Sequence, residues 1–305
     1  MVIVKSFSVG NGDMFAIRHG SDNFTIIDCC LNDENIYDIL SEIEILGNNK
    51  SIHRFISTHP DDDHIKGLEL LDAQEKILNF YCVKNEAIKK EITSSFKKYC
   101  ELRDSDKAFY IKKDCSRKWL NVGDEERGGS GINILYPNIY NKYFKDALIS
   151  AKNGCRPNNI SPIIKYSCSN FQFMWMGDLE TDFMNNIKDD IKLPKINFLF
   201  APHHGRDSGK VPEAWLKQLK PDLIIIGEAP SENLNYYKGY DTITQNTAGD
   251  ITFYIANNKC EVYVSEYEYS TTFKGDNYFA KTSYRVSIEE NNFNLGYKLL
   301  DLKIN

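Results

Sequence analysis

The stretch STHPDDDHIKG, residues 57–67, constrains this chain more than any other, because two histidines and three aspartates lie within its positions 59–64. Adjacent carboxylates repel one another, so burying them is unfavourable unless a positive charge lies among them. The residues Ile52–Thr58, IHRFIST, are β-rich and predict a short strand that delivers the acidic stretch at its carboxyl end. Such strand ends are where α/β sheets place ligands. The stretch therefore predicts a bound metal ion at the end of a strand.

Further candidate ligands follow two other apolar runs. The chain has six histidines, and four of them lie in two clusters, HPDDDH and the pair His203 and His204 in INFLFAPHHG. The run FQFMWMGDLE ends in a similar way, with Asp178 after a glycine. Taken alone, an HH pair can cap a helix and a GD pair can form a turn. Because the ends of several strands can aim side chains at one point, the three runs together favour a metal site.

Strand and helix patterns predict the fold class. The first 30 residues read as a β-meander, and the apolar spacing over residues 35–47, NIYDILSEIEILG, predicts a helix that Gly47 ends. Residues 65–119 carry mixed helical signals, strands return over residues 131–175, and a helix is predicted from Thr181. Two β-rich halves that each carry helices predict an α/β fold, a four-layer αββα sandwich. We expect residues 1–266 to form this domain and residues 267–305 to form a β-rich extension packed on it.

Composition argues against several classes of protein. The 305 residues contain no apolar run long enough to cross a membrane, and the N-terminus lacks the basic and apolar segments of a secretory signal. We therefore expect a cytoplasmic protein without a membrane partner. The eight cysteines show no CxxC spacing, which argues against a zinc ribbon and against a secreted disulfide framework.

The charge distribution leaves two interpretations open. A net charge of −6 argues against a protein that grips nucleic acid with its whole surface. Residues 84–118 nevertheless hold eleven Lys or Arg against six Asp or Glu, interleaved with aromatic residues. Such a segment can attract a phosphate backbone and stack bases. The solvated face of a helix gives the same pattern.

Several motifs resemble those of a known family. THPDDDHIKG resembles the HxHxDH signature of the metallo-β-lactamase fold, with Asp61 where the second histidine usually stands, and MGDLE and APHHG resemble its later motifs. Four further segments resemble the ComEC-type competence nuclease-like domain of that superfamily. In chain order they are FSVGNGDMFAI, FTIIDCC, RPNNISPIIKYS and ITQNTAGDITFYI. The resemblance runs from about Val4 to Val264 and thus covers most of the chain.

The resemblance implies a hydrolase with two divalent metal ions. His59 and Asp61 would bind the first ion, and Asp63 and His64 the second. Asp178 would bridge the two ions. The resemblance favours His204 as the last ligand, because it directly precedes Gly205, and His203 would then lie behind the ligands or face the substrate.

The sequence departs from the family pattern at two places. It has no histidine at residues 65–202, where many members supply a ligand, so the first metal position is expected to be weak. Asp61 in place of a histidine also shifts the preference from Zn²⁺ toward Mn²⁺ or Mg²⁺. Arg206 stands where related domains often have serine, and it can clamp a substrate phosphate or form a surface salt bridge.

The resemblance, with the two metal ions it implies, predicts a hydrolase that cleaves phosphodiester bonds in nucleic acid or nucleotides. Asp63, Asp178 and His204 are the expected catalytic residues. The residues expected to contact substrate or shape its pocket are His203, Arg206, Asn158 and Ser161. Two alternatives stay open: a hydrolase of another ester, lactone or amide bond, and a binding or regulatory module of the same fold that has lost turnover.

Overall fold

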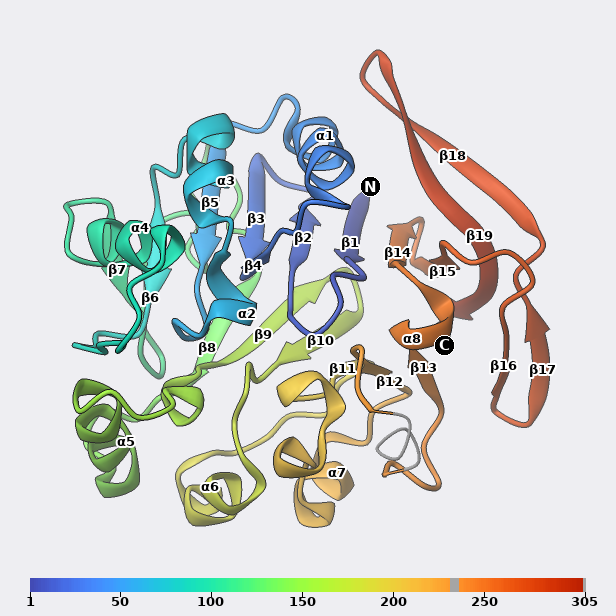
Figure 1. The fold of residues 1–305 in the computed structure, drawn as a ribbon. Helices are drawn as coiled ribbons and strands as arrows, with labels where there is room; N and C mark the ends of the chain where they lie inside the picture. Colours follow the sequence, from blue (N-terminus) through green and yellow to red (C-terminus); the bar gives the residue numbers. More distant parts are fainter. Residues whose placement is uncertain (231–235, 304–305) are drawn as a thin grey trace.

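Two large β-sheets pack face to face, and helices cover the outer side of each sheet (Figure 1). The structure is a computed structural model that describes residues 1–230 and 236–303. The layers run helices, sheet, sheet, helices, so the predicted α/β four-layer sandwich is confirmed. Within the described residues, no helix is both long enough and apolar enough to span a membrane.

The first sheet contains the N-terminal and the C-terminal strands. Its order is β18 (Thr282–Ile288), β19 (Asn291–Lys303), β15 (Lys259–Val264), β14 (Ile251–Ala256), β1 (Val2–Ser6), β2 (Phe15–Arg18), β3 (Asn23–Ile27), β5 (Ile52–Ile56), β6 (Phe80–Cys82) and β7 (Ala108–Tyr110). The short strand β4 (Cys29–Cys30) bridges to residues 65 and 66. The helices drawn on the outer side of this sheet are α1 (Ile36–Gly47), α3 (Leu68–Glu75) and α4 (Ser94–Arg103).

The second sheet contains the middle of the chain. Its order is β13 (Thr242–Thr244), β12 (Leu223–Ile226), β11 (Phe198–Phe200), β10 (Phe171–Trp175), β9 (Ile163–Cys168) and β8 (Ile132–Tyr136). Its outer helices are α5 (Lys142–Lys152), α6 (Thr181–Asn186) and α7 (Glu213–Leu219). The short helices are α2 (Asp62–Ile65) and α8 (Gln245–Ala248), with 3₁₀ turns η1 (Asn158–Ile160), η2 (Lys188–Asp190), η3 (His203–Gly205) and η4 (Asp207–Gly209).

The inner strands β1 and β3 of the first sheet are buried on both faces, which explains the continuous apolar runs VIV and FTII in the sequence. Along β1, Val2 and Val4 belong to the core between the two sheets, whereas Ile3 belongs to the core under the outer helices. The alternation follows from the two-residue period of a strand. The predicted helix over residues 35–47 is confirmed as α1, whose Ile39 and Ile43 are buried in the second of these cores.

The segment with mixed helical signals contains more than helices. Within residues 65–119 the structure has α3 and α4, but it also has β6 and β7, which pair in parallel with the edge of the first sheet. Both strands have three residues, so their alternation is too short to be recognised in the sequence.

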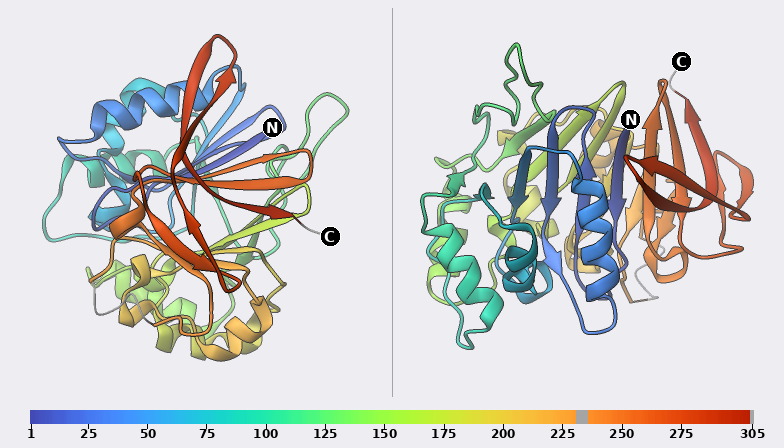
Figure 2. Two further views of the ribbon diagram at one scale, coloured as in Figure 1. Left: turned by 90° about the vertical axis from the view of Figure 1, so that its right-hand side faces the viewer. Right: turned by 90° about the horizontal axis from the view of Figure 1, so that it is seen from above.

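The C-terminal residues extend the first sheet. β15 pairs with β14, β19 pairs with β15, and β18 pairs with β19 (Figure 2). These strands therefore extend the first sheet on the side of β14 that faces away from β1. The hairpin of β16 (Ser270–Phe273) and β17 (Asp276–Phe279) forms a separate two-stranded sheet. The division of the chain at residue 266 stays a prediction.

Candidate metal centre

The candidate ligands, and the Asp28 carboxylate that holds one of them, follow the carboxyl ends of four strands. His59 to His64 follow β5, and Asp178 follows β10. His203 and His204 follow β11, which is parallel to β10. Asp28 follows β3, which is parallel to β5. Because parallel strands end at the same edge of a sheet, this topology brings both sets of ligands to a common edge of the sandwich.

The carboxylate of Asp178 lies at the middle of the group and is 2% exposed. Nε2 of His64 is 3.0 Å from Oδ1 of Asp178, and Nε2 of His203 is 3.5 Å from Oδ2. The Nε2 atoms of His59 and His204 are 3.8 and 3.9 Å from Oδ2. Both histidine clusters therefore meet on one buried carboxylate, although they lie far apart in the chain.

The second ring nitrogen of each histidine is held by an oxygen on the side away from Asp178. The Nδ1 contacts are His64 to Asp28 at 2.9 Å, His204 to Asp13 at 3.0 Å, His203 to Ser208 at 2.8 Å, and His59 to Thr58 at 3.1 Å and Ser161 at 3.3 Å. Metal-ligating histidines almost always have such a partner, because it fixes the tautomer and the orientation of the ring.

The inward-facing atoms lack the hydrogen bonds that buried polar atoms require. Nε2 of His59, His64 and His204 and Oδ1 of Asp178 are buried without a hydrogen-bond partner. His64 Nε2 and Asp178 Oδ1 are only 3.0 Å apart, but the two groups are not oriented as a hydrogen bond. Leaving such atoms unpaired is costly. A divalent cation would satisfy those of His64, His204 and Asp178, so the donor set fits a metal ion.

Ligand atoms for one ion lie within reach of one another. Among the described residues, one group of carboxylate and imidazole atoms, all within 4.8 Å of one another, could hold a metal ion, and it comprises Asp13, His64, Asp178 and His204. Asp63 lies beside this group, since its Oδ2 is 3.5 Å from Nε2 of His204. Compared with the second metal position expected from the sequence, the group contains Asp13 in addition and has Asp63 beside it rather than within it.

The charged groups of the centre shift the pKa values of one another. Burial would raise the pKa of Asp178, but the neighbouring imidazoles, His64 foremost, hold it well below its usual value. Burial would lower the pKa of His204, but Asp13 and Asp178 raise it to about 10. Burial and the charge of His64 lower the pKa of His59 to about 3. A metal ion would take the place of the protons on His64 and His204.

The backbone around the ligands adopts conformations that side chains rarely tolerate. His203 and His204 have φ of 53° and 57°, in the left-handed region, which non-glycine residues enter at a cost. Gly177, just before Asp178, has φ of +50°, and a Cβ there would lie 2.6 Å from Oγ of Ser161. The carbonyl of Gly177 also accepts a hydrogen bond from the backbone N–H of His203. These strained residues join the ends of β10 and β11 at the centre.

The first metal position is built less completely. Oδ2 of Asp61 is 3.8 Å from Nε2 of His59, but Oδ1 of Asp61 is 3.4 Å from the ammonium of Lys89. Lys89 also pairs with Asp62, at 3.1 Å. Asp61 therefore faces a lysine as well as a histidine.

The residues that were expected to contact substrate differ in how deeply they are buried. Ser161 is fully buried, and its hydroxyl accepts a hydrogen bond from the N–H of Asp178, so it supports the ligands. Asn158 is also buried, and its Oδ1 has no hydrogen-bond partner. Arg206 is half-buried and hydrogen-bonds Asn11 in the GNGD turn, so it ties the ends of the HHG and GNGD segments together.

Sequence reasoning missed Asp28 and Lys89. Asp28 ends the apolar run FTIID, and a buried acid at a strand end is a signal that could have identified it. Lys89 lies in an ordinary basic segment, and nothing in its neighbourhood in the sequence distinguishes it from Lys90.

Comparisons with known proteins give remote similarities. No family model and no curated protein matches this chain. Among solved structures it is similar to CmlA, a diiron β-hydroxylase from Streptomyces venezuelae, with 10% identity and a TM-score of 0.42 over 74% of this chain and 44% of that chain. It is also similar to the metallo-β-lactamase SMB-1 in a complex with mercaptoacetic acid, with 10% identity and a TM-score of 0.38 over 71% of this chain and 84% of that chain. The chain thus spans less than half of the length of CmlA.

Proposed function

We propose that this chain is a metal-dependent hydrolase that cleaves phosphodiester bonds in nucleic acid or nucleotides. The observation that carries the proposal is the convergence of buried, unpartnered imidazole nitrogens on Asp178. A divalent ion held there, Mn²⁺ or Zn²⁺, with Mg²⁺ also compatible, would act as a Lewis acid and make hydroxide available near neutral pH.

Some residues of the chain would bind that ion, and others would orient the side chains that bind it. Asp13, His64, Asp178 and His204 would hold it, and the contacts of Asp28 with His64 and of Asp13 with His204 would also keep the two imidazoles in the orientation that presents Nε2. Hydrogen bonds from the chain to these ligands reduce the reorganisation that binding and reaction require.

Two further side chains are placed to move protons. The side chain of Asp63 is 29% exposed, and its carboxylate can accept the proton of an attacking water. Burial lowers the pKa of His203, so its ring is neutral at pH 7, and its Nε2 lies 3.5 Å from Oδ2 of Asp178. The side chain of His203 is 8% exposed, against 0% for the other three histidines, so we assign it the relay to the leaving oxygen of the proton that the attacking water releases.

A nucleic acid substrate is supported by cavities that begin beside the centre. One, of about 350 Å³, is lined by residues 60–62 together with residues 87–91 and 154–157. Another, of about 460 Å³, is lined by residues 84–86 and by the Lys145, Leu148, Ile149 and Lys152 side of α5. The two cavities follow the same pair of chain segments away from Asp61.

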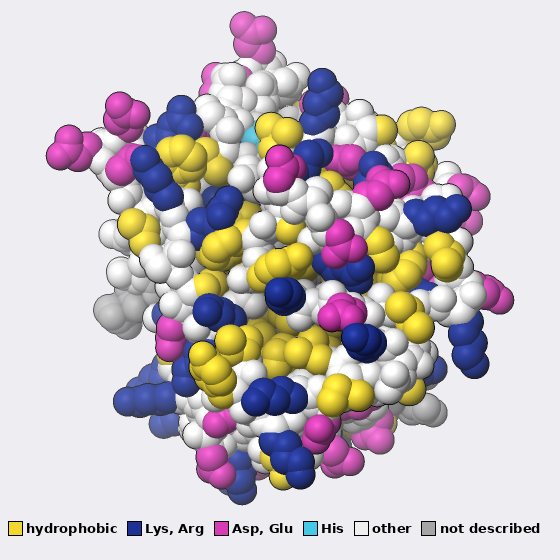
Figure 3. Space-filling view, turned by 90° about the vertical axis from the view of Figure 1, so that its left-hand side faces the viewer, with side chains coloured by type: hydrophobic (Ala, Val, Ile, Leu, Met, Phe, Trp, Pro, Cys, Tyr) yellow, Lys and Arg dark blue, Asp and Glu magenta, His cyan; other side chains and the backbone are white. Residues whose placement is uncertain are grey.

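The side chains along these segments suit a chain of phosphates. Lys84, Lys90, Lys145 and Arg156 supply positive charge there, beside the carboxylates of Asp61, Asp62, Glu86 and Glu91, and Lys84 and Lys90 belong to the basic segment predicted from the sequence. The face that carries α4 and α5 has Lys and Arg side chains spread around hydrophobic ones (Figure 3). The resemblance of the sequence to the ComEC-type nuclease-like domain supports the same class of substrate.

Hydrolysis assays test the proposal. The protein, reconstituted with Mn²⁺ or Zn²⁺, should cleave at least one of single-stranded DNA, RNA and bis(p-nitrophenyl) phosphate, and Asp63→Ala should lower the rate by about 100-fold or more. Asp276→Ala, at an exposed acid of the β16–β17 hairpin, is the matched control and should leave the rate unchanged.

Three results would contradict the proposal. Cleavage that survives Asp63→Ala or complete metal removal would come from another site. Turnover of lactones or carboxylic esters alone would place the chain among the other hydrolases. A protein that holds its metal but turns over no substrate would be a binding or regulatory module.

A further inference from the structure

We infer that Lys89 sets the number of metal ions that the centre holds. Its ammonium pairs with the carboxylate that the first ion needs, so the protein binds one divalent ion firmly and a second ion only weakly. The inference deepens the proposed function and rests on an ion being held at Asp178.

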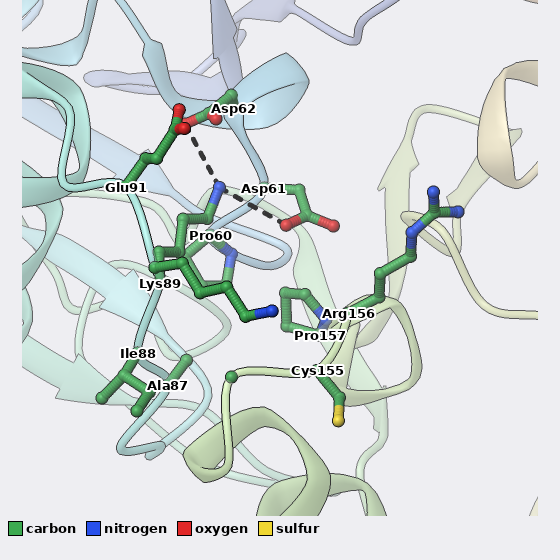
Figure 4. A pocket seen from close by; sticks show the side chains of 12 residues that line it. Pro60, Asp61, Asp62, Ala87, Ile88, Lys89, Glu91, Cys155, Arg156 and Pro157 are labelled. Atoms are coloured by element: carbon green, nitrogen blue, oxygen red, sulfur yellow. Dashed lines mark ion pairs between the residues drawn. The ribbon is translucent and has the colours of Figure 1, made fainter.

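Lys89 is fixed in place from several sides. Its Nζ is 3.4 Å from Oδ1 of Asp61 and 3.1 Å from Oδ1 of Asp62. The same ammonium lies 5.7 Å from the centre of the Phe96 ring, a cation–π distance. The side chain of Lys89 is only 16% exposed. Figure 4 shows the two ion pairs at the wall of the cavity beside Pro60.

The first metal position depends on Asp61, because few other ligands are available to it. The position draws on His59, Asp61 and a share of Asp178. The sequence has no histidine at residues 65–202 that could add another imidazole. The second position, by contrast, has Asp13, His64, Asp178 and His204 within 4.8 Å of one another. With Asp61 engaged by Lys89, the first position keeps one imidazole and a shared carboxylate.

A fixed ammonium weakens cation binding in two ways. It competes for the oxygen of Asp61, and it repels a divalent ion placed near that oxygen. Partial burial makes both effects stronger, because water and salt screen them less than at an open surface. A neutral side chain of similar length would remove both effects while leaving the surrounding contacts in place.

Metal stoichiometry tests the inference directly. Wild type and variants are loaded with Mn²⁺, desalted and analysed for bound metal by mass spectrometry. Wild type should retain about one equivalent, and Lys89→Met, which keeps an apolar chain over Phe96, should retain about two, with at least about tenfold tighter binding of the second ion. The matched controls Lys89→Arg, which keeps the charge, and Lys90→Met should both stay at about one equivalent.

A double variant and a substitute variant complete the test. Lys89→Met combined with Asp61→Asn should return to about one equivalent, because the uncovered ligand is then lost. If Lys89→Met does not fold, as judged by its circular dichroism, Lys89→Gln provides the same comparison with a polar neutral side chain.

The outcomes separate this inference from the proposed function. Two equivalents in wild type, or one in both neutral Lys89 variants, would overturn the role of Lys89 and leave the metal centre at Asp178 intact. No retained metal in any of the proteins would overturn the metal centre and this inference together.

Discussion

Nδ1 of His64 lies 2.9 Å from Oδ2 of Asp28, and both side chains are completely buried. The same carboxylate accepts hydrogen bonds from the N–H and the hydroxyl of Thr58, at 2.7 and 2.6 Å. Asp28 is thereby held in one orientation, and it in turn fixes the imidazole so that Nε2 faces Asp178. The carboxylate thus acts on the metal position through His64 without lining it.

Replacing Asp28 should weaken metal binding without removing a ligand. In Asp28→Asn the amide has no negative charge to favour the Nδ1–H tautomer, so the affinity for Mn²⁺ should fall by about 10- to 100-fold. Competition with a coloured chelator measures the change. Asp276→Asn, at an exposed carboxylate, should have the affinity of wild type, and an equal affinity in Asp28→Asn would show that Asp28 has no positioning role.

Gly177→Ala should destabilise the protein more than an alanine at another glycine with positive φ. The new Cβ would lie 2.6 Å from Oγ of Ser161 and 2.9 Å from Cβ of Thr58, in addition to the strain of a φ of +50°. We expect a loss of about 3 kcal/mol in the free energy of unfolding, from overpacking and backbone strain together.

Gly275→Ala is the matched control for that substitution. Gly275 has φ of +88°, but nothing lies within 4 Å of an added Cβ, so we expect a loss of only about 1 kcal/mol. Urea unfolding of both metal-free proteins measures the difference. Equal losses would show that Gly177 is not packed between the strand ends as described.

Metal affinity should increase with pH above neutrality. Burial lowers the pKa of His204, but Asp13 and Asp178 outweigh burial and raise it to about 10, and Asp178 and Asp28 also raise the pKa of His64. Both rings therefore carry an extra proton at pH 7, and an ion must displace it to reach the nitrogen. Since binding releases protons, a higher pH favours it until His204 is deprotonated near pH 10.

Titration calorimetry checks both parts of this prediction. Experiments in two buffers with different heats of ionisation give the number of protons released, and experiments at about pH 7 and about pH 8 give the change in affinity. An affinity that is flat or falls over this interval, with no proton release, would contradict the protonated state of these histidines.

Removing the metal should lower the thermal stability. An ion present at about 100 times its dissociation constant contributes about 2.7 kcal/mol to the folded state, which corresponds to a rise in melting temperature of roughly 5 °C or more in a chain of this size. Differential scanning fluorimetry with Mn²⁺ and with a chelator measures the shift. Asp178→Asn should abolish the response to Mn²⁺, and a response of wild-type size in that variant would place the ion elsewhere.

The sequence was sufficient to propose candidate ligands, because each follows an apolar run at a strand end, and their role as ligands stays a prediction. His59, His64, Asp178 and His204 come directly after buried strands, and the parallel pairing that unites them follows from the α/β pattern. The helix at residues 36–47 was predictable for a similar reason, since its apolar spacing has the helical period over three turns.

Contacts between distant segments were not predictable in this way. The pairing of Lys89 with Asp61 depends on where the segment after β6 crosses the loop after β5, which no local pattern records. The burial of Ser161 and its hydrogen bond to the backbone of Asp178 depend equally on how two loops pack. Short edge strands such as β6 and β7 escaped detection because three residues are too few to show a period.

Anomalous diffraction from crystals of the protein grown with Mn²⁺ tests the central claim most directly. The account predicts a strong anomalous peak within coordination distance of the Asp178 carboxylate and of Nε2 of both His64 and His204, at about 2.0–2.3 Å. A peak elsewhere on the molecule, or none while Mn²⁺ is bound in solution, would contradict the assignment of this buried group of side chains as the metal centre.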